Sequence, residues 1–334
     1  MTKKVAVLPG DGIGPEVVSA TVSAIDALCL DIEFVNADIG FDCYKRTGSA
    51  LPKQTLDTID ECDAILVGCV NDDGTDRVYR NPVMEIKKRL DLFANVRPIK
   101  KIAQDIGVKD LNVIVIREYT EGLFSMNEIE DLDGVTHQRR ISYKGCKRIC
   151  QFARNLSECE DRKRITCVHK ANVYKIADGL FKNTFYEVMA DSKLEIDDTK
   201  VDDMAAEIVL HPDNVDVITT MSMYGDILSR EAAALVGGTH LCPSGNYGVH
   251  KALFEPLHKS NPELVGLNVV NPTGSLLSGA MLLEYLGMPE KARTLRDAVL
   301  TAYKRGYRTK DVGGTHGTYE FSDQIAKLCE NPQL

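Results

Sequence analysis

In Val217-Ile-Thr-Thr-Met-Ser-Met-Tyr-Gly-Asp-Ile-Leu-Ser-Arg230 the chain passes from a strand to a helix. Apolar and β-branched residues at 215–220 predict the strand, and Tyr224 and Gly225 predict a turn before the helix. Open α/β sheets bind ligands at such junctions, so Asp226 is a candidate site residue. Arg230 follows four residues later, and we expect both side chains on one helix face. They can pair with each other, or they can divide an anionic substrate and a cation between them.

The alternation of strands and helices extends in both directions from this junction. Earlier strands are predicted at 5–8, 33–37, 64–68, 113–117 and 164–169. Helices are predicted at 16–28, 53–62, 84–95, 144–156, 180–190, 271–286, 291–305 and 319–329, with a further helix ending at 210. Residues 134–143 are interpreted as an antiparallel excursion and residues 237–258 as a glycine-rich connection. The alternation predicts an α/β fold.

Length, charge and cysteine content narrow the class of protein. The 334 residues are 44% hydrophobic, which is enough for a large core and two lobes. The net charge of −9 argues against general binding to nucleic acids or anionic membranes. No segment has the apolar length of a membrane span, and the N-terminus is typical of a first strand. Ten cysteines without a Cys-x-x-Cys pair favour reduced thiols and a cytoplasmic location.

Three features outside the opening junction give weaker indications of a site. Residues 9–15 hold three glycines, but their spacing is not the dinucleotide-binding fingerprint, so a purely structural turn is favoured. Residues 71–81 are polar and follow a strand, where specificity-determining groups often lie. Arg117 ends a predicted strand and is a candidate site residue, the alternative being a solvated loop arginine.

Six spaced motifs follow one another along the chain. They are Gly10-Asp-Gly-Ile-Gly-Pro-Glu16, Asp91-Leu-Phe-Ala-Asn-Val-Arg-Pro98, Arg117-Glu-Tyr-Thr-Glu-Gly122, His169-Lys-Ala-Asn172, Tyr224-Gly-Asp-Ile-Leu-Ser229 and Asn271-Pro-Thr273. In this order they resemble the β-decarboxylating dehydrogenases, the family of isocitrate, homoisocitrate and 3-isopropylmalate dehydrogenases. The resemblance covers nearly the whole chain. Residues 120–122 and 169–172 look more like the isocitrate and homoisocitrate branches.

The resemblance implies a two-lobed α/β fold of the isopropylmalate dehydrogenase type, with one sheet running through both lobes and a cleft between them. The first domain, residues 1–98 plus 245–334, is expected to bind the cofactor. The second, residues 99–244, is expected to hold the dimer interface and the metal-site residues. A homodimer with shared active sites is implied, or a hetero-oligomer with a catalytic paralogue.

The implied reaction is NAD-dependent oxidative decarboxylation of a (2R)-malate-type 2-hydroxy acid. Arg97 and Arg117 match the arginines that bind substrate carboxylates, which suits their planar fork of donors. Lys170 and Asp202 match catalytic residues contributed by the neighbouring subunit. The match also makes Asp202 and Asp226 ligands of Mg²⁺ or Mn²⁺, cations that prefer oxygen ligands. In addition, Asn172 matches a substrate contact.

Cofactor binding is implied for residues 254–272. The positions that match are His258, Ser260, Asn261, Glu263 and Asn271. An acidic residue at 263 would accept the ribose hydroxyls of NAD and repel the extra phosphate of NADP. The family usually has glycine where Lys259 stands and alanine where Asn261 stands, so Lys259 either lies over a phosphate or obstructs the loop.

Four positions depart from the family pattern. Lys87 stands where relatives have the first substrate arginine, and it keeps the charge without the planar fork. Phe124 replaces a tyrosine that helps to protonate the enol. Tyr119 stands where this branch often has asparagine. Arg230 replaces a third metal-site aspartate and is counted among the candidate substrate-binding residues with Lys87.

These departures leave three hypotheses open. The first is an active enzyme in which Arg230 binds an additional anionic group and the cation binds only together with substrate. The second is a catalytically silent or regulatory subunit of an isocitrate-dehydrogenase-like complex. The third is a protein that binds a cofactor or metabolite without turnover. The survival of Lys170, Asp226, Arg97 and Arg117 favours the first.

Overall fold

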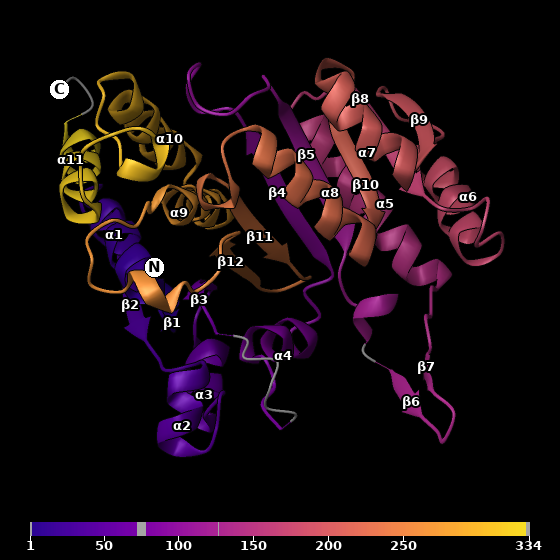
Figure 1. The fold of residues 1–334 in the computed structure, drawn as a ribbon, viewed down its shortest axis with the longest axis horizontal. Helices are drawn as coiled ribbons and strands as arrows, with labels where there is room; N and C mark the ends of the chain where they lie inside the picture. The colour runs from indigo at the N-terminus through magenta and orange to yellow at the C-terminus, as the bar shows by residue number, and fades with distance from the viewer. Residues whose placement is uncertain (1, 72–77, 126, 332–334) are drawn as a thin grey trace. The chain divides into compact units, whose positions relative to one another are not determined.

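The computed structural model describes residues 2–71, 78–125 and 127–331 and shows a mixed α/β fold (Figure 1). The chain forms two compact units. Unit 1 comprises Met1–Leu90, Ile102–Ile106 and Gly237–Leu334, and unit 2 comprises Asp91–Lys101 and Gly107–Val236. The expected boundaries lay at 98/99 and 244/245. Residues 91–98 belong instead to unit 2, because the strand they enter pairs with a strand of that unit.

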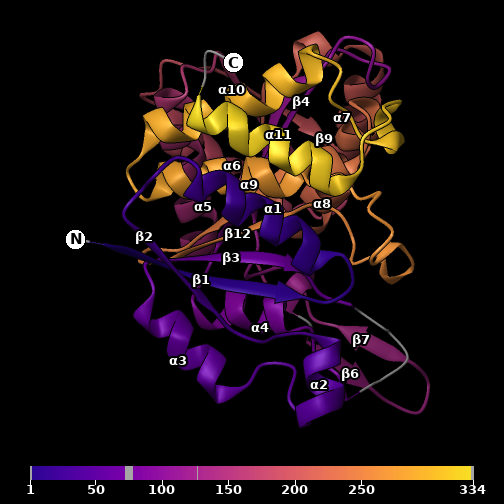
Figure 2. The same cartoon turned by 90° about the vertical axis from the view of Figure 1, so that its left-hand side faces the viewer.

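The strands of unit 1 lie in the order β2 (Ile32–Asn36), β1 (Lys3–Gly10), β3 (Ala64–Cys69), β12 (Ala252–Pro256) and β11 (Pro243–Tyr247). All neighbours are parallel except β11 and β12. The helices are α1 (Gly14–Asp26), α2 (Phe41–Thr47), α3 (Lys53–Glu61), α4 (Pro82–Arg89), α9 (Thr273–Tyr285), α10 (Pro289–Lys304) and α11 (Thr318–Glu330). Figure 2 shows α1 and α9 on one face of these strands and α2 and α3 on the other.

The strands of unit 2 lie in the order β4 (Ala94–Lys100), β5 (Asn112–Glu118), β10 (Val217–Met221), β8 (Arg164–His169) and β9 (Glu195–Lys200). Only β4 is antiparallel to its neighbour. The helices are α5 (Tyr143–Cys159), α6 (Ala177–Met189), α7 (Val201–Leu210) and α8 (Ser222–Leu235), and β6 (Glu128–Glu130) forms a hairpin with β7 (Val135–His137). The parallel strands end at one edge, so residues that follow them are brought together there.

Most predicted strands and helices are confirmed to within a few residues. The strands are rich in β-branched residues with both faces covered, and β3 and β10 are buried along their whole length. None of the ten cysteines forms a disulfide bond. No helix in the described ranges is long and apolar enough to cross a membrane.

Two predictions in the region before β5 and after α8 were wrong. The helix predicted at 84–95 ends at Arg89, since Asp91 has a positive φ of 47° and the next residues enter β4. The glycine-rich connection is the β11–β12 hairpin, whose buried Ser244 and Asn246 gave it the polar composition of a loop. In addition, α2 and β9 were missed, because their residues are largely polar.

The turn predicted at Tyr224 and Gly225 was also wrong, because α8 begins at Ser222, directly after β10. Gly225 lies inside this helix. A Cβ added there would lie 2.8 Å from the Arg117 Cβ and 2.9 Å from a Thr220 methyl carbon. The glycine therefore allows α8 to pack closely against β5 and its own strand.

Candidate active site

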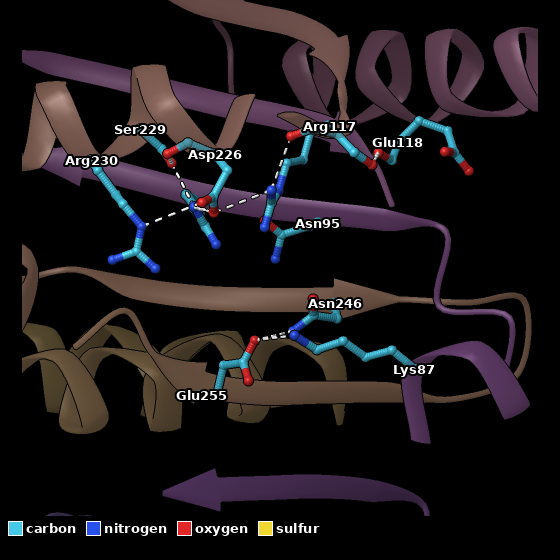
Figure 3. A network of polar contacts seen from close by, with 11 residues as sticks. Lys87, Asn95, Arg117, Glu118, Asp226, Ser229, Arg230, Asn246 and Glu255 are labelled. Atoms are coloured by element: carbon cyan, nitrogen blue, oxygen red, sulfur yellow. Dashed lines mark hydrogen bonds and ion pairs between the residues drawn. The ribbon is translucent and has the colours of Figure 1, made fainter. Parts of the chain in front are cut away.

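Three arginines surround the Asp226 carboxylate in unit 2 (Figure 3). Arg97 Nη1 donates a hydrogen bond of 2.8 Å to Oδ1, and Arg117 Nη1 lies 3.2 Å from the same oxygen. Arg230 Nε lies 3.4 Å from Oδ2. Asp226 and Arg230 therefore lie on one helix face, as predicted, and they contact each other, which is one of the two alternatives. We call Asp226 with these three arginines the arginine cluster.

Two of the arginines are fixed by the sheet. Arg97 lies on β4 and also donates to Ser229 Oγ, and its side chain is 6% exposed. Arg117 lies at the end of β5, where its Nε donates to Asn95 Oδ1 and its Nη1 to the Ser222 carbonyl. These contacts hold both guanidinium groups against the first turns of α8.

Two aromatic rings contact Arg117. Its Cζ lies 5.2 Å from the Tyr119 ring centroid and 5.3 Å from that of Phe124, and the two rings are 5.3 Å apart. Phe124 therefore lies beside Arg117, a candidate substrate-binding residue, and offers no hydroxyl there. The Phe124 ring keeps a cation–π contact with the guanidinium.

The arginines of the cluster determine the charge state of Asp226. Burial alone would raise the pKa of Asp226, but Arg117, Arg97 and Arg230 outweigh it and lower that pKa to about 2. The carboxylate is therefore ionised at neutral pH and lies within 3.4 Å of all three guanidinium groups.

A divalent cation does not fit these residues. Within the described ranges, no group of three or more His, Cys, Asp or Glu side chains could hold a metal ion. A divalent cation about 6 Å from one guanidinium meets a repulsion of about 5 kcal/mol at an effective dielectric of about 20. Asp202 of the same chain pairs with Lys170, and the resemblance assigns the second metal ligand to the Asp202 of a neighbouring subunit.

Lys170 and Asp202 form an ion pair at the ends of neighbouring parallel strands. Lys170 directly follows β8, and Asp202 lies in the first turn of α7, directly after β9. The hydrogen bond from Lys170 lowers the pKa of Asp202. Asn172 is exposed two residues further on. The structure thus brings the two predicted catalytic residues together.

The segment that carries Lys170 is held by acidic residues that sequence reasoning missed. Asp178, on α6, accepts hydrogen bonds from the Lys170 backbone nitrogen and from the Tyr224 hydroxyl, and it pairs with Arg139 at 2.7 Å. Asp198, on β9, accepts a hydrogen bond from His169 Nε2. No motif in the sequence includes Asp178 or Asp198. The one indirect signal is Tyr224, which belongs to a recognised motif and donates to Asp178.

Lys87 lies in unit 1 and has a different environment. Its ammonium is 2.5 Å from Glu255 Oε1, and the side chains are 7% and 16% exposed. Asn246 Nδ2 donates to the same carboxylate oxygen at 3.0 Å (Figure 3). The charge of Lys87 is balanced by Glu255, and its substrate-binding role stays a prediction.

The candidate cofactor residues of unit 1 lie in a loop packed on the turn after β1. Ile13 N donates to the Ser260 carbonyl at 2.8 Å, and a Cβ at Gly12 would lie 2.1 Å from that oxygen. Asn261 has a positive φ of 38°, and Glu263 and Lys259 are exposed. Asn271 is buried and donates to Tyr303 and Asp311. The glycine-rich turn therefore fixes the position of this loop.

His258 is buried in the same loop. Burial lowers its pKa to about 4, so the ring is neutral near pH 7. Its Nδ1 lies 2.9 Å from the Lys259 carbonyl, which can only accept, so Nδ1 carries the proton. Nε2 is then an acceptor, and it is buried without a partner among the described residues. Such an atom fits a ligand that donates a hydrogen bond, and an adenine amino group is one.

The comparisons with known proteins agree with this arrangement. Residues 4–325 match the family model for isocitrate/isopropylmalate dehydrogenases. The chain belongs to this family. Its relatives are β-decarboxylating dehydrogenases.

The chain is 40% identical to homoisocitrate dehydrogenase of Methanocaldococcus jannaschii, with 96% of each chain covered. It is 39% identical to 3-isopropylmalate dehydrogenase of Methanothermobacter thermautotrophicus, covering 98% of this chain and 99% of that one. The crystal structure of isocitrate dehydrogenase from Methylococcus capsulatus matches with a TM-score of 0.94 and 32% identity, covering 98% and 100% of the two chains. The similar identities do not separate the branches, so the placement nearer isocitrate and homoisocitrate dehydrogenases stays a prediction.

Proposed function

We propose that this protein oxidises a (2R)-malate-type 2-hydroxy acid with NAD and then decarboxylates the product. One observation carries the proposal: Arg97, Arg117 and Arg230 converge on Asp226. A malate-type acid has two carboxylates, and guanidinium forks bind carboxylates well. The substituent on the malate core distinguishes the branches, and residues 72–77 of the loop expected to recognise it lie outside the described residues.

The residues of the chain have distinct tasks in this proposal. Arg97 and Arg117 hold the substrate carboxylates. Lys170, in its neutral amine form, takes the proton of the substrate hydroxyl while the carbon that bears this hydroxyl loses a hydride. The carbon–carbon bond to the β-carboxylate then breaks, CO₂ leaves, and the enol is protonated at carbon. Lys170, protonated in the first step, is the group that we assign to return this proton, and its ammonium is oriented by the hydrogen bond to Asp202.

NAD supplies the hydride acceptor when it is bound. The buried acceptor on His258 and the loop fixed against the glycine turn fit a nucleotide. Exposed Glu263 would accept hydrogen bonds from ribose hydroxyls and repel the phosphate of NADP. Mg²⁺ or Mn²⁺, which the family resemblance implies, would bind weakly and only together with the substrate, since Asp226 is surrounded by arginines.

A homodimer with shared sites is part of the proposal. Val173, Tyr174 and Ile176 follow Lys170 and are exposed, with Ile176 at 90%. Met223 and Ile227, which flank Asp226 on α8, are exposed too. Apolar residues gathered at a site are typical of protein interfaces. Ten unpaired cysteines fit a reducing compartment such as the cytoplasm.

A silent or regulatory subunit is the second candidate. Phe124 has no hydroxyl to donate, and Arg230 occupies the place of a carboxylate. A paralogue in the same genome with an intact Gly-Asp-Ile-Leu-Ser-Asp stretch would support this candidate.

A screen of malate-type acids for NAD reduction, with and without Mn²⁺, tests the proposed function. We expect NADH to form with at least one acid. If no acid is oxidised, the proposed enzymatic activity is rejected in favour of the silent or regulatory subunit. Replacing NAD by NADP should lower the rate, and Glu263→Ala should reduce that preference.

A further inference from the structure

We propose that Asp178 is a positioning residue of the reaction: it fixes the backbone of Lys170, joins it to the start of α8, and so orients the lysine amine for proton transfer. The inference deepens the proposed function, on which it rests for the role of Lys170. The contacts that carry it all lie within unit 2 of one chain. They are therefore the same whether Lys170 serves its own site or, as the resemblance implies, that of a neighbouring subunit.

The first support is the set of hydrogen bonds around the Lys170 backbone. Its nitrogen donates to Asp178 Oδ2 at 2.7 Å, and the Tyr224 hydroxyl donates to the same oxygen at 3.2 Å. The Lys170 carbonyl accepts from the backbone nitrogens of Val173 and Tyr174, each at 2.9 Å. Both polar groups of this backbone are therefore held, and the side chain starts from a fixed point.

The second support is the way in which Asp178 itself is fixed. Its side chain is 1% exposed, and a carboxylate at such depth is costly unless it is paired. Arg139 pairs with Oδ1 at 2.7 Å, and its Cζ lies 5.0 Å from the Tyr174 ring centroid and 5.7 Å from that of Tyr224. These residues come from the segment after β7, from α6 and from α8. Contacts between distant segments therefore determine where the carboxylate lies.

The third support is the place where Lys170 leaves the sheet. Strand β8 ends at His169, and Lys170 belongs to no helix or strand. His169 Nδ1 accepts from the Ala171 backbone nitrogen at 3.1 Å, so the residue after Lys170 is held too. A misplacement of about 1 Å can cost about 10²-fold in rate. A carboxylate that fixes this irregular segment therefore acts on the rate through Lys170.

Asp216 offers a matched control at the opposite end of β8. Its carboxylate accepts hydrogen bonds from the backbone nitrogens of Lys163 and Arg164, at 2.7 and 3.0 Å, and it pairs with Arg162 at 2.8 Å. Asp216 and Asp178 thus make the same kinds of contact, one before the strand and the other after it. If both carboxylates served the fold alone, the two substitutions would have the same consequences.

The test compares Asp178→Asn with Asp216→Asn in the full-length protein. An amide cannot accept from Lys170 and pair with Arg139 at once, because its amino group then faces one of these donors. We expect Asp178→Asn to lower kcat for NADH formation about tenfold, with the KM for NAD unchanged, since the cofactor loop lies in unit 1. Hydrogen exchange of residues 169–175, measured by mass spectrometry without ligands, should become faster. Asp216→Asn should lower the free energy of unfolding and leave kcat and this exchange unchanged.

Tyr224→Phe is a second variant for the case that Asp178→Asn does not fold. It removes one donor to Asp178 and keeps the ring beside Arg139. We expect it to accelerate exchange of residues 169–175 and to lower kcat by a smaller factor. Unchanged exchange and unchanged kcat in this variant would then overturn the inference.

Two results for Asp178→Asn would overturn the inference: exchange and kcat equal to those of the wild type, or a loss of kcat that Asp216→Asn shares. Either leaves the proposed function intact, because the wild type still forms NADH. If the wild type forms no NADH, the proposed function is rejected, and faster exchange of residues 169–175 in Asp178→Asn still supports the fixing of Lys170 while unchanged exchange overturns it. The two proposals therefore fail separately.

Discussion

Two ionic sites of this protein differ in charge balance. In unit 1, Lys87 and Glu255 form a nearly buried ion pair, with Asn246 as an additional donor to the carboxylate. In unit 2, one carboxylate faces three guanidinium groups, and Arg230 remains half-exposed. A buried ion pair contributes mainly to structure. A half-exposed arginine such as Arg230 can still donate to a ligand, so the comparison leads us to propose anion binding in unit 2.

The largest effect on turnover is expected from replacing Lys170, because we assign proton transfer to this residue of unit 2. Lys170→Ala should lower kcat by about 10³-fold or more, which is typical for the loss of a general acid or base. Steady-state NADH formation measures it. Lys163→Ala, at an exposed lysine of the same unit, is the control and should leave the rate unchanged. Near wild-type turnover in Lys170→Ala would reject the active-site assignment.

The next effect breaks the balanced pair. Glu255→Gln removes the carboxylate 2.5 Å from the buried Lys87 ammonium and should lower the free energy of unfolding by about 3 kcal/mol. Urea denaturation measures it. The double variant Lys87→Met with Glu255→Leu should recover most of this loss, because it removes both charges. A loss below about 1 kcal/mol in Glu255→Gln would show that the pair is not the structural element we describe.

The third effect is a pH dependence of the arginine cluster. The pKa of Asp226 is lowered to about 2 in the folded protein, below its ordinary value of about 3.9 when unfolded. Its ionisation therefore stabilises the fold above about pH 4, by about 2 kcal/mol, and this contribution is lost as the pH falls towards 2. We expect the stability difference between wild type and Asp226→Asn to shrink over this range. A difference that stays constant with pH would contradict the assigned cause.

The smallest effect concerns Arg230 and stability. Its ion pair with Asp226 is 3.4 Å long and partly exposed, so Arg230→Gln should change the free energy of unfolding by no more than about 0.5 kcal/mol. Urea denaturation of both proteins measures it. A loss above about 1 kcal/mol would mean that Arg230 serves the fold and not a ligand.

The features predicted correctly from sequence depend mostly on neighbours along the chain. Asp226 and Arg230 were placed together because residues four apart share a helix face, whatever else surrounds them. The strands β1, β3, β5 and β8 were found from their apolar, β-branched runs. The roles of Lys170 and Asp202 came from the family resemblance, and no spacing rule supplied them.

The features that were missed depend on contacts between distant residues. Glu255 lies 168 residues from Lys87, so the sequence around Lys87 could not predict this ion pair. No strand was predicted around Arg97, which follows the helix predicted at 84–95, but it lies on β4, a strand whose partner β5 decides its conformation. Asp178 was missed because its carboxylate serves a backbone nitrogen and a tyrosine from another motif.

Binding of Mn²⁺ to the purified protein without substrate tests the central claim most directly. Electron paramagnetic resonance measures the free ion in titrations of wild type and Arg230→Asp. We predict weak binding to wild type and binding at least about tenfold tighter in Arg230→Asp, since the substitution changes the local charge by two units. Tight Mn²⁺ binding to the wild-type protein, unchanged in Arg230→Asp, would contradict the account of this site as one for anions.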